Sequence, residues 1–352
     1  HRDLHLSLRR QRQMCIRDRY IELDPVIESK FILQRSGENF KKYLFSFYNS
    51  DGQELSLRPD LTISSVIRYA QSKSNKKEKV FYTGSAFRKS YNQKNVVVRQ
   101  IGMEIFSSKN ENIDDKEIID ISLKILKSSR YRSSKLNIGN FKLFELLINK
   151  LQIPQRWKQR LIKFFWNKKY FSELLKRLES NLDIDPVAVA GDKKMYSKMI
   201  KLNKKKIING RSYKEIIKRF ESKINDPRQS ETGKKSAKII KEFLKIKCSL
   251  NNAPNVLNKF FKKYDLNIFV NKDFFPIKDL KIKDTKFEFS TSIGRGREVE
   301  FYNSLIFSLD VKKKNKFVNL ISGGRFDELT SKYLGLKKGP AVGAAVNLSN
   351  YE

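Results

Sequence analysis

The chain has 352 residues, of which 74 are Lys or Arg and 38 are Asp or Glu, so its formal net charge is +36. Its hydrophobic content of 39% is that of a folded protein, and its length suggests about two domains. No apolar run reaches the roughly 20 residues that span a bilayer, which argues against a membrane protein. No signal-peptide pattern is present, so we expect a cytoplasmic location.

The positive charge invites a nucleic-acid interpretation, because Lys and Arg neutralise phosphates. The lysines are spread along the chain, however, in runs such as 204–206, 234–235 and 312–314. A charge run alone is weak evidence, and this spread is more typical of a solvated surface. We therefore expect no nucleic-acid partner.

The first 19 residues differ from the rest of the chain, since they hold six Arg and no Lys. The run "RQMCIRDR" resembles translated sequencing-adapter read-through, and we expect residues 1–19 to be a non-native segment. Both histidines and Cys15 lie there, so Cys248 is the only thiol of the remainder. Without a histidine, the remainder excludes a Ser-His-Asp triad and a His-ligated metal site.

Residues 20–139 are strand-rich. The stretch 43–62 predicts two strands joined at Ser50-Asp51-Gly52, where the glycine supplies a positive φ. The runs "KVFYTGSAFR" and "NVVVRQIGMEIF" predict two further strands, which are rich in β-branched and aromatic residues. We expect a helix over 114–128 with acidic residues in its first turn, followed by a short strand at "KLNIG".

Residues 140–270 carry a helical pattern instead. Apolar residues recur at helical spacing over 144–151 and 171–178, which predicts core-facing amphipathic helices. Ser212 and Glu215 are spaced as a capping box, and 224–235 is predicted to be an exposed linker.

Strands return over 271–352, and Gly323-Gly324 predicts a tight strand-to-helix turn before "RFDELTSKYLG". Strands, a helical block and then strands again predict an α+β fold. Its core would comprise 20–139 and 271–352, with 140–270 as a helical insertion.

Three separated segments place polar residues on otherwise apolar strands. In "LRPDLT", Arg58, Asp60 and Thr62 would alternate on one strand and share a face, as would Gln100 and Glu104 on another. The third segment holds Arg297, Glu300 and Tyr302. Such a cluster suits an amino-acid pocket, because carboxylates bind ammonium and arginine binds carboxylate or phosphate. From spacing alone, a set of structural ion pairs is an equal alternative.

Five fragments resolve this ambiguity by resemblance: "LRPDLT", "FYTGSAFR…RQIGMEIF", "EFYNSLIF", "GGRFDEL" and "PAVGAAVNL". In this order and spacing they resemble the catalytic core of class II histidyl-tRNA synthetases over nearly all of 20–348. The resemblance implies an antiparallel sheet flanked by helices. It also implies a histidine pocket lined by Asp60, Thr62, Gln100, Glu104, Arg297, Tyr302 and Phe326, with Arg88 at the position of the arginine that holds the ATP α-phosphate.

The sequence departs from that family at the ATP end of the site. The residues after Arg88 are "KSYNQKN", without the acid and arginine that help to seat ATP. Val96, Val97, Val98 and Arg99 replace the family's usual residues before the matched glutamine, and Asn350 replaces the arginine for the γ-phosphate. Removing a full positive charge from a triphosphate site loses electrostatic stabilisation. The chain also leaves no room for the anticodon-binding domain that follows in true synthetases.

These features are similar to those of a non-catalytic branch of the family, the regulatory subunits of ATP phosphoribosyltransferase. That resemblance implies no catalytic residue, no cofactor and no metal. The implied partners are a short-form catalytic subunit of ATP phosphoribosyltransferase and a second copy of this chain, within a hetero-octamer, with histidine as an allosteric ligand. The alternative is a truncated histidyl-tRNA synthetase catalytic domain.

Overall fold

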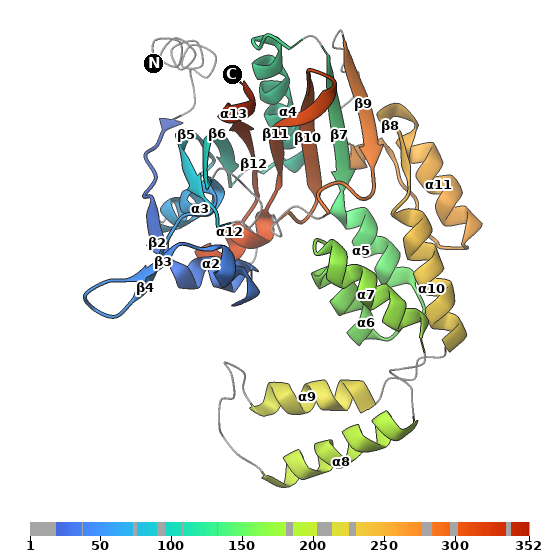
Figure 1. Cartoon of the computed structure of the whole chain (residues 1–352). Coiled ribbons are helices and arrows are strands. Elements are labelled where there is room, and N and C mark those ends of the chain that lie inside the picture. Colours follow the sequence, from blue (N-terminus) through green and yellow to red (C-terminus); the bar gives the residue numbers. More distant parts are fainter. Residues whose placement is uncertain are drawn as a thin grey trace.

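The computed structural model describes residues 19–36, 38–72, 76–89, 96–107, 109–131, 133–180, 186–202, 213–224, 230–275, 284–295, 302–335 and 339–351. In these residues, nine strands form one large sheet in the order β1-β5-β6-β12-β11-β10-β7-β9-β8 (Figure 1). Neighbouring strands are antiparallel except at β1/β5 and β7/β9. A small sheet of β2, β4 and β3 lies beside it.

The strands differ in length, and the longest form the middle of the large sheet. They are β1 (Arg19–Tyr20), β2 (Val26–Glu28), β3 (Ser46–Tyr48), β4 (Glu54–Leu57), β5 (Glu78–Phe87), β6 (Val97–Phe106), β7 (Ser134–Asn140), β8 (Lys247–Ser249), β9 (Thr285–Ser290), β10 (Leu305–Lys313), β11 (Lys316–Arg325) and β12 (Ala341–Asn347).

The described helices fall into those that cover the sheet and those of the middle of the chain. They are α2 (Ser29–Ser36), α3 (Leu61–Gln71), α4 (Glu111–Lys127), α5 (Phe141–Lys150), α6 (Gln155–Lys163), α7 (Lys168–Glu179), α8 (Pro186–Leu202), α9 (Tyr213–Ile224), α10 (Ser230–Phe243), α11 (Ala253–Lys263), α12 (Asp327–Leu334) and α13 (Leu348–Tyr351). Short 3-10 helices lie at Glu38–Tyr43, Leu250–Asn252 and Lys272–Phe274.

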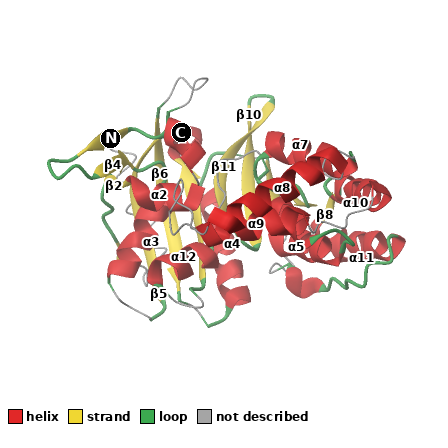
Figure 2. Ribbon diagram, turned by 90° about the horizontal axis from the view of Figure 1, so that it is seen from below, coloured by secondary structure: helices red, strands yellow, loops and turns green. Residues whose placement is uncertain are grey.

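The central strands bury side chains on both faces, because each face is covered by different helices. On one face, Ile101, Met103 and Ile105 of β6 belong to the large core to which α4 contributes. The other face packs against α3 and α12. Its buried side chains include Val80 and Tyr82 of β5 and Phe106 of β6. Figure 2 shows α3 and α12 at one end of the sheet, and α5, α7, α10 and α11 gathered at the other.

The predicted amphipathic helices are confirmed. Phe144, Leu147, Ile148 and Leu151 are buried, and Phe171, Leu174, Leu175 and Leu178 are buried with them in one core. The block also contains a strand that the helical pattern did not predict. β8 pairs with β9 and extends the sheet, since the short sequence KCS carries no periodicity of its own.

The β3/β4 hairpin is confirmed, and Gly52 has the positive φ expected of the turn, +73°. The strand predicted through Arg58, Asp60 and Thr62 is wrong, because β4 ends at Leu57. Pro59 cannot donate to a ladder, and the Asp60 side chain accepts a hydrogen bond from the Ile63 amide as the N-cap of α3.

Three boundaries also differ from the sequence prediction. α4 begins at Glu111 rather than 114, because Asn110 supplies its N-cap. α10 begins at Ser230, so the second half of the predicted linker is helical. Gly323-Gly324 lies inside β11, and the helix follows only at Asp327. The capping box predicted for Ser212 and Glu215 is not described, because Ser212 lies outside the described residues.

The two glycines are required inside β11 for a packing reason. A Cβ on Gly323 would lie 2.5 Å from the Phe307 ring, and one on Gly324 would lie 2.6 Å from the Tyr302 ring. Close approach of aromatic rings to the strand, rather than a turn, therefore explains this pair.

Candidate functional site

Glu104 is a carboxylate buried in the middle of the sheet. It lies on β6, 2% exposed, and its Cα partners are Val80 and Gly343 on the neighbouring strands. A Cβ on Gly343 would lie only 1.5 Å from Glu104 Oε2. The glutamate therefore occupies the space that the missing side chain of Gly343 leaves free.

Tyr82 on β5 is the direct partner of Glu104. Its hydroxyl donates to Glu104 Oε1 at 2.5 Å, and its ring lies over Gly102, where a Cβ would be 2.2 Å from the ring. The sequence analysis did not single out Tyr82. Gly102 and Gly343 are the signal that could have found it. A glycine inside a strand marks a place where a large side chain from a neighbouring strand lies over the backbone.

The start of α3 completes this cluster. Asp60 is the N-cap residue, and Thr62 lies in the first turn with its hydroxyl close to both Tyr82 and Glu104. Burial raises the pKa of Glu104 to about 8, with a further contribution from Asp60, while the hydroxyls of Tyr82 and Thr62 oppose the rise. Glu104 is thus largely protonated at neutral pH.

The second oxygen of Glu104 is the unusual feature of this cluster. Oε2 is buried and has no hydrogen-bond partner among the described residues. A buried polar atom without a partner is costly, and such atoms call for a specific explanation such as a ligand. An ammonium group is the natural partner, because it would both donate to Oε2 and stabilise the ionised carboxylate.

Gln100 lies on the same face of β6 as Glu104, as predicted. It is half-buried and pairs with Gly84 on β5 and Asn347 on β12. The guanidinium of Arg58 occupies the space over Gly84 and donates to the carbonyl oxygens of Ser85 and Leu23. Arg58 is thereby committed to the backbone, whereas Gln100 extends the polar row that leads to Glu104.

Arg88 follows the last residue of β5 and is half-buried. Its Nε donates to the carbonyl oxygen of Pro59 at 2.7 Å, and its amide donates to Val96 at the other side of the loop. The arginine therefore connects the β5–β6 hairpin with the segment that leads into α3. Most of the loop that follows lies outside the described residues.

Two aromatic residues predicted for the pocket pack beside Tyr82. Phe326 is 1% exposed and meets Phe106 edge-on, with ring centroids 6.3 Å apart. Tyr302 is half-buried over Gly324 and belongs to the same apolar cluster. The structure therefore brings Asp60, Thr62, Glu104, Tyr302 and Phe326 around one region of the sheet, whereas Arg297 lies outside the described residues.

Arg325 positions Phe326, and the sequence analysis did not identify it. It is 1% exposed; its Nε and Nη2 donate to Asp115 Oδ1 at 3.0 and 2.6 Å, and its Nη1 donates to Asp327. The same Asp327 oxygen accepts from the Ala341 amide. Asp115 and Asp327 thus both pair with the buried guanidinium, and α4, β11, α12 and β12 are joined at this point.

Asn350 stands where the resemblance would place an arginine for the γ-phosphate. Its amide nitrogen donates to the Asn319 carbonyl at 2.8 Å, and its own carbonyl accepts from Tyr131. The side-chain nitrogen and the main-chain oxygen of this residue are therefore used within the fold, and it brings no positive charge.

The described residues contain no group of three or more His, Cys, Asp or Glu that could hold a metal ion. Within the same part of the chain, no helix is both long enough and apolar enough to cross a membrane.

Comparisons with known proteins bear on the family and the fold of the chain. The family model described as histidyl-tRNA synthetase matches residues 23–223. A Sinorhizobium fredii protein named ATP phosphoribosyltransferase regulatory subunit is 24% identical over 348 residues, covering 93% of this chain and 90% of its own. A protein of the same name from Allorhizobium ampelinum is 27% identical over 349 residues, covering 93% and 91%.

Two solved structures share the fold. One is an ATP phosphoribosyltransferase regulatory subunit/histidyl-tRNA synthetase from Bacillus halodurans, with a TM-score of 0.53 at 19% identity, covering 95% of this chain and 73% of its own. The other is a histidine–tRNA ligase subunit from Alicyclobacillus acidocaldarius, with a TM-score of 0.53 at 14% identity, covering 95% and 86%. The predicted class II synthetase-like sheet is thus confirmed. Because the family model matches more than half of its residues, the chain belongs to the histidyl-tRNA synthetase family.

Proposed function

We propose that this protein is the regulatory subunit of an ATP phosphoribosyltransferase and has no synthetase activity of its own. The observation that carries the proposal is the similarity to proteins of that name along 93% of this chain and about 90% of theirs. The subunit would pair with a short-form catalytic subunit in the cytoplasm. That partner would transfer the phosphoribosyl group of phosphoribosyl pyrophosphate to ATP, the first step of histidine biosynthesis.

The two ends of the candidate site support this proposal in different ways. At the amino-acid end, Glu104 keeps a buried oxygen without a partner, which an ammonium group would satisfy. At the phosphate end, Asn350 is neutral and bonded to the backbone, and Arg88 donates to the Pro59 carbonyl. A site of this kind suits binding of an amino acid better than activation of one by ATP.

Feedback control by histidine follows if the ligand binds two states of the assembly with different affinity. In the proposed arrangement, two copies of this chain dimerise through the core made of 20–139 and 271–352, within a hetero-octamer. Histidine occupies the pocket around Glu104, Gln100, Asp60 and Thr62, with Tyr302 and Phe326 at its border. The bound state then favours the inactive arrangement of the catalytic subunits.

Co-expression with a short-form catalytic subunit tests the proposal. We expect the two chains to co-purify and to give phosphoribosyl transfer that neither shows alone, and we expect added histidine to inhibit it. A catalytic subunit that is equally active without this chain would overturn the proposal.

The alternative is a truncated histidyl-tRNA synthetase catalytic domain, which the description of the matching family favours. Histidine-dependent exchange between ATP and pyrophosphate separates the two functions. We expect no exchange above that of a variant with Glu104→Ala, whereas exchange by the unaltered chain would favour the synthetase.

A further inference from the structure

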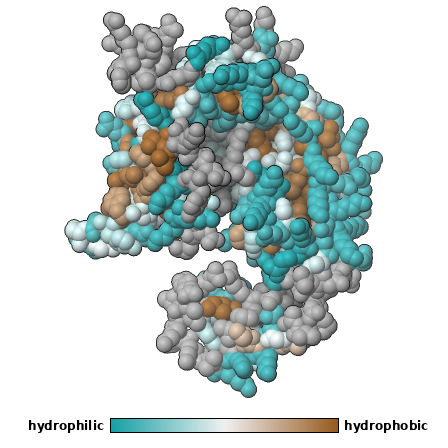
Figure 3. Space-filling view, in the orientation of Figure 1, coloured by the Kyte–Doolittle hydropathy of each residue, from teal (hydrophilic) through white to brown (hydrophobic). Residues whose placement is uncertain are grey.

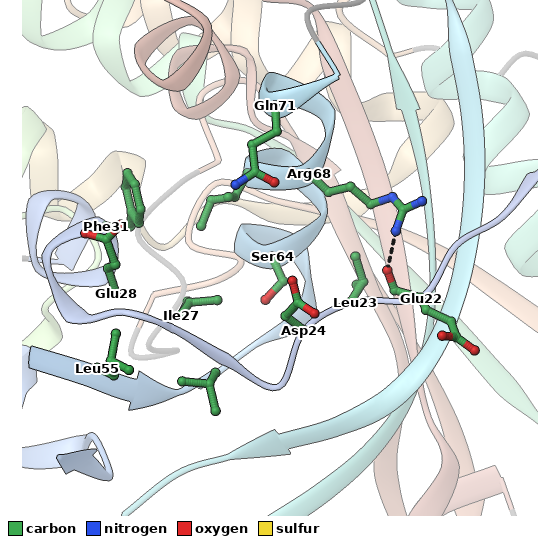
Figure 4. Close-up of a pocket in the computed structure, with 12 residues that line it drawn as sticks. Glu22, Leu23, Asp24, Ile27, Glu28, Phe31, Leu55, Ser64, Arg68 and Gln71 are labelled. Carbon is green, nitrogen blue, oxygen red and sulfur yellow. Dashed lines mark hydrogen bonds between the residues drawn. The ribbon is translucent and has the colours of Figure 1, made fainter. Parts of the chain in front are cut away.

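A cavity of about 330 Å³ lies on the other side of α3 from Glu104. α3 presents Leu61, Val66 and Tyr69 to the cluster of Tyr82 and Phe326. Its residues Ser64, Ile67, Arg68 and Gln71 recur at i, i+3, i+4 and i+7 and line the cavity instead. The segment 22–28, α2 and β4 form the remaining walls (Figure 4). The cavity is therefore separate from the proposed histidine pocket.

The cavity combines an apolar surface with polar groups at its edge. Half-buried apolar side chains provide the surface, and they are Leu23, Val26, Phe31, Leu55 and Ile67. Cavities for small ligands are typically of this kind, with volumes from about 300 Å³ and a few placed polar groups. At about 30 Å³ per water, the volume corresponds to a ligand of roughly ten non-hydrogen atoms.

One polar group in this wall has no partner. Ser64 is 5% exposed, and its Oγ has no hydrogen-bond partner among the described residues. Figure 4 shows the Ser64 side chain beside the Asp24 carboxylate. A helical serine commonly bonds the carbonyl one turn before it, as Ser122 of α4 does with Ile118. Ser64 makes no such bond, so its hydroxyl is available to a ligand.

The charge of the lining is opposite to that of the chain. Lys and Arg outnumber Asp and Glu by 74 to 38 overall, yet the cavity is lined by Glu22, Asp24 and Glu28 against Arg68 alone. The Arg68 guanidinium donates to the Glu22 carbonyl at 2.7 Å, and the Glu22 carboxylate points away in Figure 4. Glu28 pairs with Lys30. Asp24, which is exposed and interacts electrostatically with Arg58, is the acid beside Ser64.

We propose that this cavity binds a small organic cation, a primary amine carried on an apolar body. The ammonium group would lie between the Asp24 carboxylate and the Ser64 hydroxyl, which accept its protons. The apolar body would cover Phe31, Leu55 and Ile67, and removing that surface from water contributes the remaining affinity.

Calorimetric titration of the full chain with phenethylamine at pH 7 tests the proposal. The neutral 2-phenylethanol has almost the same shape and serves as the matched probe without the charge. We expect the amine to bind at least tenfold more tightly than the alcohol. No measurable binding of the amine, or equal binding of both probes, would overturn the proposal.

Variants of the lining locate the binding. Asp24→Asn should weaken the amine about five- to tenfold, and Ser64→Ala should weaken it about threefold without lowering the unfolding midpoint, because the hydroxyl has no partner to lose. Glu231→Gln on α10 is the matched control, since its side chain is 86% exposed and far along the chain. It should leave amine binding unchanged.

Glu104→Gln separates this site from the histidine pocket. We expect that variant to bind phenethylamine as the unaltered chain does. Loss of amine binding in Glu104→Gln, with retention in Asp24→Asn, would place the amine in the other pocket and contradict the proposal.

Discussion

Glu104 and Glu288 are both buried glutamates on the same large sheet, but the fold treats them in opposite ways. Glu104 lies on the interior strand β6, where burial raises its pKa to about 8. Glu288 lies on β9, next to the edge strand β8, and is 6% exposed. Burial also raises its pKa, but three lysines outweigh that effect and bring it to about 2.

The difference lies in the neighbours rather than in the depth of burial. The lysines that surround Glu288 are Lys135 at 2.5 Å, Lys286 at 2.9 Å and Lys247 at 3.1 Å. They reach it from β7, β9 itself and the edge strand β8, with their own stems partly in water. Glu104 lies on an interior strand and accepts from the Tyr82 hydroxyl instead of pairing with lysines. A carboxylate of the first kind, which is ion-paired by lysines, is structural, whereas one without a cationic neighbour is suited to a cationic ligand.

Figure 3 shows hydrophilic residues over much of the face that it presents. The ion pairs of Glu288 show how some of the 74 basic residues serve the fold.

The largest expected effect comes from filling the space that Glu104 occupies. In Gly343→Ala the new Cβ would overlap Glu104 Oε2 and lie 2.7 Å from the Met103 carbonyl, so we expect a loss of about 3 kcal/mol or more in unfolding free energy. Urea unfolding measures it. Gly191→Ala is the control, because nothing lies within 4 Å of its added Cβ. Equal stability of the two variants would show that Glu104 does not need this space.

The next effect is the pH dependence that Glu104 imposes on stability. Its pKa is raised on folding from 4.5 to about 8, so the native state holds a proton that the unfolded state releases between those values. Stability from this group is complete below about pH 4.5 and is lost as the pH rises through 8. Between pH 6 and 7.5, Glu104→Gln should therefore gain about 2 kcal/mol relative to the unaltered chain. A constant difference across that range would contradict the raised pKa.

A smaller effect concerns histidine, and it depends on the proposed function. An ammonium ligand needs the ionised carboxylate, so histidine should bind about fivefold more tightly at pH 8 than at pH 7. Glu104→Gln should bind more weakly and lose this dependence. Calorimetry at both pH values measures it, with Glu231→Gln as the control; the same affinity at pH 7 and 8 would exclude Glu104 as the ammonium partner.

The smallest effect is expected at Glu288, because its lysines are partly solvated. Its pKa falls on folding, so its contribution is complete above about pH 4.5 and is lost as the pH falls toward 2. We expect Glu288→Gln to cost about 1 kcal/mol at pH 7 and nothing well below pH 2, and to cost less in 1 M salt. Thermal unfolding at the two pH values measures the change. A pH dependence of the same sign as that of Glu104→Gln would break the comparison.

The sequence by itself determined the elements whose residues carry a strong local pattern. The β5 and β6 strands, the amphipathic helices α5 and α7 and the Asp-Gly turn all follow from periodicity or backbone geometry, which need only neighbouring residues. The placement of Gln100 and Glu104 on one face follows from the same alternation.

The resemblance to histidyl-tRNA synthetases predicted which residues belong to the pocket. Only the tertiary structure decided which of them contact one another. Asp60 reaches the cluster as a helix N-cap rather than as a strand residue, because Pro59 ends the strand. Tyr82 and Gly343 act on Glu104 from β5 and β12, 22 and 239 residues away, and no local pattern encodes such pairings. The same holds for the protonation of Glu104 and the ionisation of Glu288, since each pKa depends on neighbours that only the folded sheet brings together.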